Sequence, residues 1–226
     1  MTEVGGRTYG GETAEERVRR RRAALIDAAI VVVAEHGWRQ LTVERVCDAA
    51  GLIRRYFYES FHDVDALGRA VVDTGTQRLL ARLTRHDLTA PPAELIHTVI
   101  DTTVCFAAEN PQLMRVLFGE LASSGTATEH RQTAIRSIIA ALAADARAAH
   151  RADDPLLDLT ASLLVNGSVH TLLDWLDGTV AMDRDQFVDD LAQMWLVISD
   201  GAINRIAAKP PAGGSSGPIA GPETHQ

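Results

Sequence analysis

Residues 49–61 read AAGLIRRYFYESF, and this stretch decides how the surrounding chain folds. Two alanines and a glycine precede two arginines and four aromatic side chains, although aromatic residues make up only 5% of the whole chain. Phe57 and Phe61 lie four residues apart, so on a helix they form one apolar stripe that faces a core. The other large side chains are then left for the outward faces: Arg54, Arg55, Tyr56 and Tyr58.

The chain upstream of this stretch carries the signals of two helices. Apolar residues recur at helical spacing from Ala14 to His36, which predicts a first helix over this range. Gly37 follows as a C-terminal cap. Thr42 is then placed to cap a short second helix over residues 43–50.

The stretch itself completes a helix-turn-helix layout. Gly51 stops the helix over residues 43–50, and a further short helix is predicted over residues 54–60. In such a motif the second helix lies in the major groove of DNA, so its outer face must carry hydrogen-bond donors. Arginine pairs with guanine edges, and tyrosine hydroxyls bond to phosphates. The alternative is that Tyr56 and Tyr58 only cover the core, but the adjacent arginines and the glycine turn favour DNA.

Charge is distributed unevenly along the chain. The formal net charge is -8, yet residues 1–62 hold 10 arginines against 9 acidic residues, so the acidic excess lies in residues 63–226. Such asymmetry indicates a protein of two parts, with chance as the plain alternative. The run RVRRRR at residues 17–22 is typical of a solvated segment or of a contact with a polyanion.

Composition and missing motifs exclude several classes of protein. The longest apolar run, AALIDAAIVVVA, contains Asp27 and is too short to span a membrane, and no secretion signal is predicted. Cys47 and Cys105 form no CxxC unit, so free thiols and a cytoplasmic location are expected. The sequence contains no HExxH and no phosphate-binding glycine loop, and its GxSxG match, GGSSG at residues 213–217, lies in the glycine- and proline-rich C-terminal stretch. We therefore predict no enzymatic activity and no cofactor.

A longer segment, LTVERVCDAAGLIRRYFYESFHDVDAL at residues 41–67, resembles the DNA-binding part of the TetR family of bacterial transcriptional regulators. The shared pattern is a threonine, a short helix, Ala-Ala-Gly, a short recognition helix ending in Tyr-x-x-Phe, and a capped fourth helix. The likeness extends over about residues 20–70. It implies that Arg54, Arg55 and Tyr56 face the bases. It places four further side chains near the phosphates: Thr42, Arg45, Tyr58 and His62.

Two positions depart from the pattern of that family. A serine or threonine usually precedes the recognition helix, whereas this chain has Ile53, which cannot cap it. The fourth helix usually begins with a lysine that contacts phosphate, whereas this chain has Val64 between Asp63 and Asp65. A phosphate contact is therefore not expected there. The arginine-rich run at residues 17–22 is a candidate to replace it.

The rest of the chain is predicted to be helical, which makes the fold all-α. Asp63 is placed to cap a helix that runs from Val64 to beyond Leu83. Further helices are expected at 94–110, 111–122, 129–150, 156–178 and 184–208, with a loop at 123–128. On the helix from residue 94, five residues are expected to point inward: Ile96, Val99, Ile100, Thr103 and Ala107.

These elements predict two domains with two unstructured ends. The expected division is a flexible arm at 1–13, a three-helix helix-turn-helix DNA-binding domain at 14–62, a helical ligand-binding and dimerisation domain at 63–208, and a disordered tail at 209–226.

The last two long helices are the expected dimer surface. The resemblance implies that they pair with their copies in a four-helix bundle, and a homodimer suits the motif, because two recognition helices about 34–36 Å apart read a palindrome. Small and apolar residues support this pairing: Leu156, Ala161, Ser162, Leu163, Gly167, Trp195 and Ile198. The alternative is that these residues form ordinary core within one chain.

The resemblance also implies a pocket among the middle helices for a small apolar or amphipathic effector. Its wall should be apolar with a few polar groups, and the candidates are Phe106, Met114, Leu117, Phe118, Asn166, His170 and Trp175. Each could instead be plain core or surface. His97, Asp101 and Cys105 recur at four-residue spacing, as zinc ligands can. No fourth ligand is evident, so an exposed or pocket-edge stripe is favoured and no metal site is predicted.

The sequence therefore predicts a DNA-binding transcriptional regulator. Its expected form is a ligand-responsive repressor that acts as a homodimer on a palindromic operator. The alternative is a helical protein that binds small molecules or partners and has lost specific DNA recognition.

Overall fold

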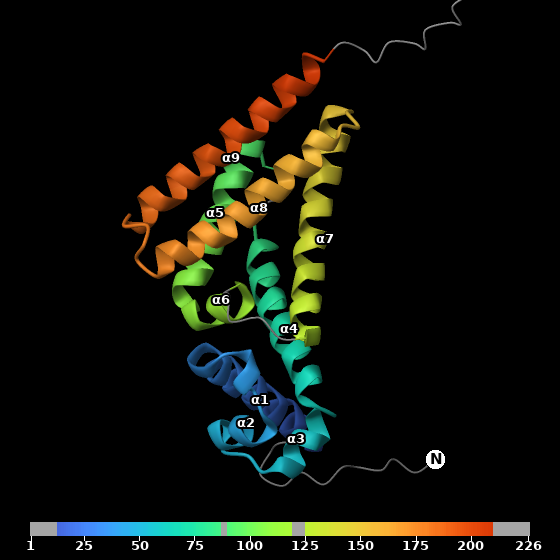
Figure 1. Cartoon of the computed structure of the whole chain (residues 1–226), viewed down its shortest axis with the longest axis vertical. Helices are drawn as coiled ribbons and strands as arrows, with labels where there is room; N and C mark the ends of the chain where they lie inside the picture. The colour runs from blue at the N-terminus through green and yellow to red at the C-terminus, as the bar shows by residue number, and fades with distance from the viewer. Residues whose placement is uncertain (1–12, 87–89, 119–124, 210–226) are drawn as a thin grey trace, which may run out of the picture.

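A computed structural model gives the structure of residues 13–86, 90–118 and 125–209, which contain helices and no strand (Figure 1). The helices are α1 (Ala14–His36), a 3-10 turn η1 (Trp38–Gln40), α2 (Val43–Ala50), α3 (Arg54–Ser60), α4 (Val64–Leu83), α5 (Pro92–Glu109), α6 (Pro111–Phe118), α7 (Gly125–His150), α8 (Pro155–Leu176) and α9 (Arg184–Ala207). The predicted all-α fold is confirmed. The predicted arm apart from Thr13, and the predicted tail apart from Lys209, lie outside the described residues.

Short-range capping contacts set the ends of the first helices. The Thr13 hydroxyl accepts a hydrogen bond from the Glu16 backbone while the Glu16 carboxylate accepts one from the Thr13 backbone, so a capping box starts α1. Thr42 and Asp63 cap α2 and α4 in the predicted way. Gly51 ends α2 with a φ of 64°, a left-handed conformation that glycine adopts without strain.

Three local details differ from the sequence-based expectation. Helix α7 begins at Gly125, so the loop predicted at 123–128 is wrong from that residue onward. The turn η1 between α1 and α2 was not predicted. On α5, Thr102, Val104 and Phe106 are also buried, whereas Ile96, Val99 and Thr103 are only half-buried. The reason is that α5 packs on α9 and also against α4, α6 and α8, so more than one stripe of it is covered.

The helices are arranged along one long axis (Figure 1). Helices α1, α2 and α3 form a three-helix head at one end, and α8 and α9 lie side by side at the other. Helix α4 runs from the head into the body, where it packs on α5, α6 and α7. Helix α1 also packs directly on α6, so the head contacts the body through two helices, α4 and α6.

One hydrophobic core continues from the head into the body. It contains buried side chains from α1 to α6 together with residues of α8 and α9. Gly75 of α4 allows α6 to sit close, because a Cβ at this position would lie 2.7 Å from Leu117 Cδ1. The head and the body are therefore joined by continuous packing.

Candidate nucleic-acid interface

The recognition helix α3 is anchored by the predicted aromatic stripe. Phe57 is completely buried, Phe61 is nearly so, and their ring centroids are 5.9 Å apart. Both side chains belong to the hydrophobic core. Because this stripe faces inward, helical geometry turns the flanking residues of α3 toward the surface.

The predicted base-reading residues of α3 do not share one environment. Arg54 and Arg55 are exposed, and Tyr58 is 60% exposed. Tyr56 is half-buried, and the guanidinium carbon of Arg21 lies 3.6 Å from the centre of its ring. Tyr56 therefore supports an arginine of α1, whereas Tyr58 presents its hydroxyl to solvent.

The residues predicted to lie near phosphates surround α3. The Thr42 hydroxyl accepts a hydrogen bond from the Arg45 backbone at the start of α2, and the Arg45 side chain is exposed. His62, just after α3, lies 3.0 Å from a carboxylate oxygen of Asp63. Arg54 reaches Glu44 of α2 at 3.4 Å, which brings the start of α2 beside the start of α3.

Sequence reasoning did not identify the acidic partners of these arginines. Glu59 accepts a hydrogen bond from Arg55 Nε at 3.0 Å and one from Arg21 Nη1 at 3.3 Å. The first pair could have been found from its four-residue spacing on α3. The second joins α1 to α3 across the head, and nothing in the local sequence indicates it.

The N-terminus of α3 lacks a side-chain cap, as the sequence predicted. Ile53 has the extended backbone of an N-cap residue but makes no capping hydrogen bond, and its side chain is 59% exposed. We expect Ile53→Ser to raise the free energy of unfolding by about 1 kcal/mol, because the hydroxyl can accept a bond from a free backbone N–H of α3. Urea denaturation measures this change.

Ile53→Ala is the matched control, since it removes the same apolar side chain without supplying an acceptor. Equal unfolding free energies for the serine and alanine variants would contradict a missing cap at this position.

The candidate effector residues divide into two groups in the structure. Phe106, Met114 and Leu117 are buried in the core, and half-buried Phe118 packs against it. Trp175 stacks on Phe187 at 5.2 Å and donates a hydrogen bond to the Met182 carbonyl. By contrast, Asn166 and His170 are exposed on α8. The seven residues therefore do not surround one common space.

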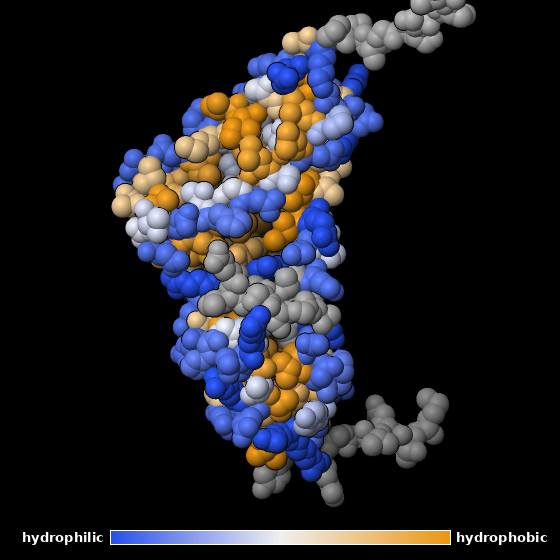
Figure 2. All heavy atoms as spheres, viewed as in Figure 1, coloured by the Kyte–Doolittle hydropathy of each residue, from blue (hydrophilic) through white to orange (hydrophobic). Residues whose placement is uncertain are grey.

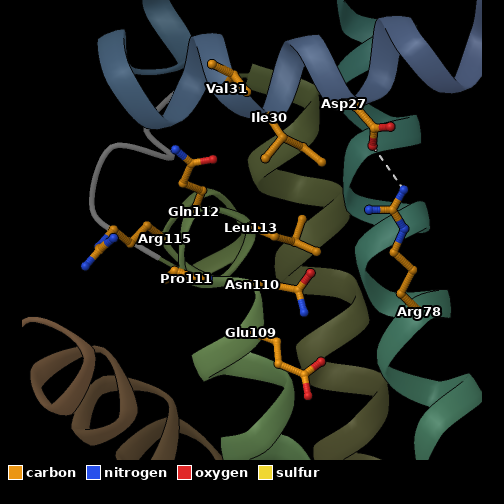
Figure 3. Close-up of a pocket in the computed structure, with 10 residues that line it drawn as sticks. All are labelled: Asp27, Ile30, Val31, Arg78, Glu109, Asn110, Pro111, Gln112, Leu113 and Arg115. Carbon is orange, nitrogen blue, oxygen red and sulfur yellow. Dashed lines mark hydrogen bonds and ion pairs between the residues drawn. The ribbon is translucent and has the colours of Figure 1, made fainter.

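A cleft of about 510 Å³ lies instead where the head meets the body (Figure 3). Its wall combines residues of α1, α4, the end of α5 and α6: Asp27, Ile30, Val31, Arg78, Glu109, Asn110, Pro111, Gln112, Leu113 and Arg115. Arg78 Nη2 and Asp27 Oδ1 are 3.0 Å apart and join α4 to α1 at its edge. This volume lies within the usual range of small-molecule sites.

The stripe of potential zinc ligands on α5 contacts α9. His97 Nε2 is 2.9 Å from Asp189 Oδ1. Arg184 forms an ion pair with Asp101 and lies 2.8 Å from the sulfur of Cys105. In the part of the chain that the structure describes, no three of the His, Cys, Asp and Glu side chains are grouped to hold a metal ion.

Helices α8 and α9 share an apolar surface at the far end from the head. Its large exposed side chains define the α8–α9 face: Leu159, Leu163, Met194, Val197 and Ile198. Figure 2 shows apolar residues gathered over these two helices. Asn166 and His170 continue the spacing of Leu159 and Leu163, so they lie on the same side of α8. Of the other residues expected there, Ala161 is buried, and half-buried Trp195 bonds to Ser168 within the chain.

Among the described helices, α8 has the length and the apolar composition needed to cross a membrane. An 18-residue stretch of it has a mean hydropathy of 1.3, and 22% of that stretch is buried in the structure. Its exposed apolar residues continue onto α9, which does not meet that test. Two adjacent helices thus share the exposed apolar surface.

Comparisons with known proteins agree with this geometry. Residues 25–71 match the family of bacterial regulatory proteins of the tetR type, and residues 91–196 match the tetracyclin repressor-like C-terminal domain.

Solved structures of the same fold include a TetR-like transcriptional regulator from Rhodococcus sp. RHA1, with 17% identity and a TM-score of 0.63 over 84% of this chain and 97% of that one. A tetR-family regulator from Streptomyces coelicolor has 19% identity and a TM-score of 0.63, over 85% and 90% of the two chains. The fatty acid degradation regulator FadR from Bacillus halodurans has 18% identity and a TM-score of 0.62, over 78% and 94%. With both parts of the chain matched and the helix-turn-helix head in place, the protein belongs to the TetR family of bacterial transcriptional regulators.

Proposed function

We propose that this regulator is a ligand-responsive repressor that binds a palindromic operator as a homodimer. The observation that carries the proposal is the division of α3, which keeps Phe57 in the core and leaves Arg54, Arg55 and Tyr58 exposed. Exposed arginines on a recognition helix pair with guanine edges, and a tyrosine hydroxyl reaches phosphate. Thr42, Arg45 and His62 would add contacts to the backbone of the operator.

The α8–α9 face supports the homodimer. An exposed apolar surface made by two adjacent helices is unfavourable in water, and a second copy related by a twofold axis would cover it. Asn166 and His170 would then be polar members of this interface. Two heads in a symmetric dimer read two inverted half-sites about 34–36 Å apart. A dimer that occupies a promoter in this way blocks transcription, so we assign repression.

The junction cleft supports a response to a small molecule. Because its wall includes α1 of the head and α6 of the body, a bound molecule would contact both and would favour one orientation of the head. The apolar part of the wall, formed by Ile30, Val31 and Leu113, suits a small apolar or amphipathic effector. One protein of the same fold is a fatty acid degradation regulator, which agrees with an effector of this class. DNA as the partner places the protein in the cytoplasm.

Selection of bound duplexes from random DNA tests the proposal directly. The expected product is a set of duplexes with two inverted half-sites and with binding that weakens steeply as salt rises. Equal weak binding to every duplex would overturn the proposal. It would favour a protein that binds small molecules or partners without specific DNA recognition.

Arg55→Ala should reduce affinity for the selected operator by about 1–3 kcal/mol per half-site, because an arginine fork paired with guanine contributes about this much discrimination. The reduction should disappear on duplexes in which that guanine is replaced. Fluorescence anisotropy with both duplexes measures the difference. An unchanged base preference in the variant would remove Arg55 from the base-reading residues.

A further inference from the structure

Glu59 is an unexpected residue on a helix that reads DNA. It is the only acidic residue in α3, and its side chain is 36% exposed. A carboxylate on this face repels the phosphates of a duplex unless cations neutralise it. Glu59 meets this condition, because Arg55 and Arg21 both bind its oxygens.

The contact with Arg55 uses one particular edge of the guanidinium group. Arg55 Nε donates to Glu59 Oε1 at 3.0 Å. The two terminal nitrogens of Arg55, which form the fork that pairs with guanine O6 and N7, are not used by this bond. Arg54 differs in this respect, because its pair with Glu44 involves the terminal nitrogen Nη2 at 3.4 Å. The Arg55 fork is therefore oriented and available, whereas the Arg54 fork is partly occupied.

The contact with Arg21 ties the arginine-rich run of α1 to the same carboxylate. Arg21 Nη1 lies 3.3 Å from Glu59 Oε2, and the guanidinium group stacks on the ring of Tyr56. The Arg21 side chain is only 23% exposed, so its position is well defined by these two contacts. Glu59 consequently has one oxygen fixed by α1 and the other free to fix Arg55.

We propose that Glu59 is a positioning residue that determines specificity: it holds Arg55 by its Nε edge for base reading, with Arg21 and Tyr56 as its support. The proposal rests on the proposed function of α3. It also predicts that the charge of Glu59 weakens binding to duplexes that lack this guanine, because the carboxylate repels the phosphates while the Arg55 fork gains no base contact.

Two substitutions separate the positioning role from the charge. Glu59→Ala removes both the acceptor and the charge, whereas Glu59→Gln keeps an acceptor oxygen for Arg55. Affinities are measured over a salt series on three duplexes: the selected operator, the operator with the guanine under Arg55 replaced, and a scrambled duplex of equal length.

Discrimination here is the ratio of the affinity for the operator to the affinity for the operator with that guanine replaced. Glu59→Ala should lower this ratio about tenfold, whereas Glu59→Gln should retain most of it. Both should bind the scrambled duplex more tightly, with a salt slope steeper by about 1 per half-site.

Glu35→Gln is the matched control for charge, because Glu35 is an exposed residue of α1 whose recorded ion pair is with the adjacent His36. It should leave base discrimination unchanged. The proposal is overturned if Glu59→Ala discriminates at the guanine as well as the parent chain does. It is also overturned if Glu59→Gln and Glu35→Gln change the affinity for the scrambled duplex equally. If the parent chain selects no duplex at all, the proposed function fails as well. If the parent chain selects an operator but the Glu59 variants do not show the expected changes, only the role of Glu59 is removed.

Discussion

Phe57→Ala is expected to destabilise the three-helix head by about 3–5 kcal/mol and to abolish operator binding. Among the described residues, Phe57 is the largest of the completely buried side chains, and it belongs to a helix of seven residues, so its loss leaves a cavity that the rest of α3 cannot fill. A loss of this size is a large fraction of the total stability of a domain. Urea denaturation followed by circular dichroism measures it, and anisotropy with the operator measures the loss of binding.

Tyr58→Ala is the control for this substitution. It truncates the adjacent aromatic side chain, which is mostly exposed and contacts the Phe57 ring edge-on at 5.4 Å. We expect it to change the unfolding free energy by less than about 1.5 kcal/mol. If both alanine variants unfold at the same denaturant concentration as the parent, the inward stripe does not hold α3 in place.

Leu163→Glu is expected to convert the proposed homodimer into a monomer and to weaken operator binding on the order of 100-fold to 10,000-fold. Leu163 lies on the α8–α9 face and is 58% exposed in the single chain. A twofold interface would bury two copies of the new carboxylate without a partner, which costs several kcal/mol for each. A monomer loses the effective concentration that links the two half-sites. Sedimentation equilibrium gives the oligomeric state, and anisotropy gives the affinity.

Leu80→Glu makes the same change at an exposed leucine of α4, outside the α8–α9 face. It should leave the dimer and the operator affinity unchanged within about twofold, as surface substitutions usually do. A Leu163→Glu protein that still sediments as a dimer would place the interface elsewhere on the molecule.

The ends of the helices could be predicted from the sequence because they depend on contacts within a few residues. Thr42, Gly51 and Asp63 each act on a backbone group at most five residues away, so their meaning is local. The aromatic stripe of α3 was predictable for the same reason, since Phe57 and Phe61 are one helical turn apart. The start of α7 at Gly125 was missed, because Gly125, Thr126 and Thr128 are weak helix formers.

The placement of the candidate effector residues could not be predicted in this way. Phe106, Met114 and Leu117 are apolar residues that suit a pocket wall and a core equally well. Which of the two they form depends on whether a neighbouring helix packs against them. Here the absence of a side chain at Gly75 allows α4 to lie against Leu117, and all three residues belong to the core. A cleft lies instead at the head–body junction, where helices distant in sequence meet.

The sequence by itself determined the helices, the helix-turn-helix motif and the arginine and tyrosine side chains of α3, because periodicity, caps and glycine turns act over a few residues. Only the tertiary structure decided which charges meet: Arg21 and Glu59 are 38 residues apart, and Asp27 and Arg78 are 51 residues apart. Such pairs depend on how the helices cross. The crossing is set by long-range packing of the core, and no local sequence pattern encodes it. The same packing placed Arg21 over the ring of Tyr56 and left the Arg55 side chain exposed beside Glu59.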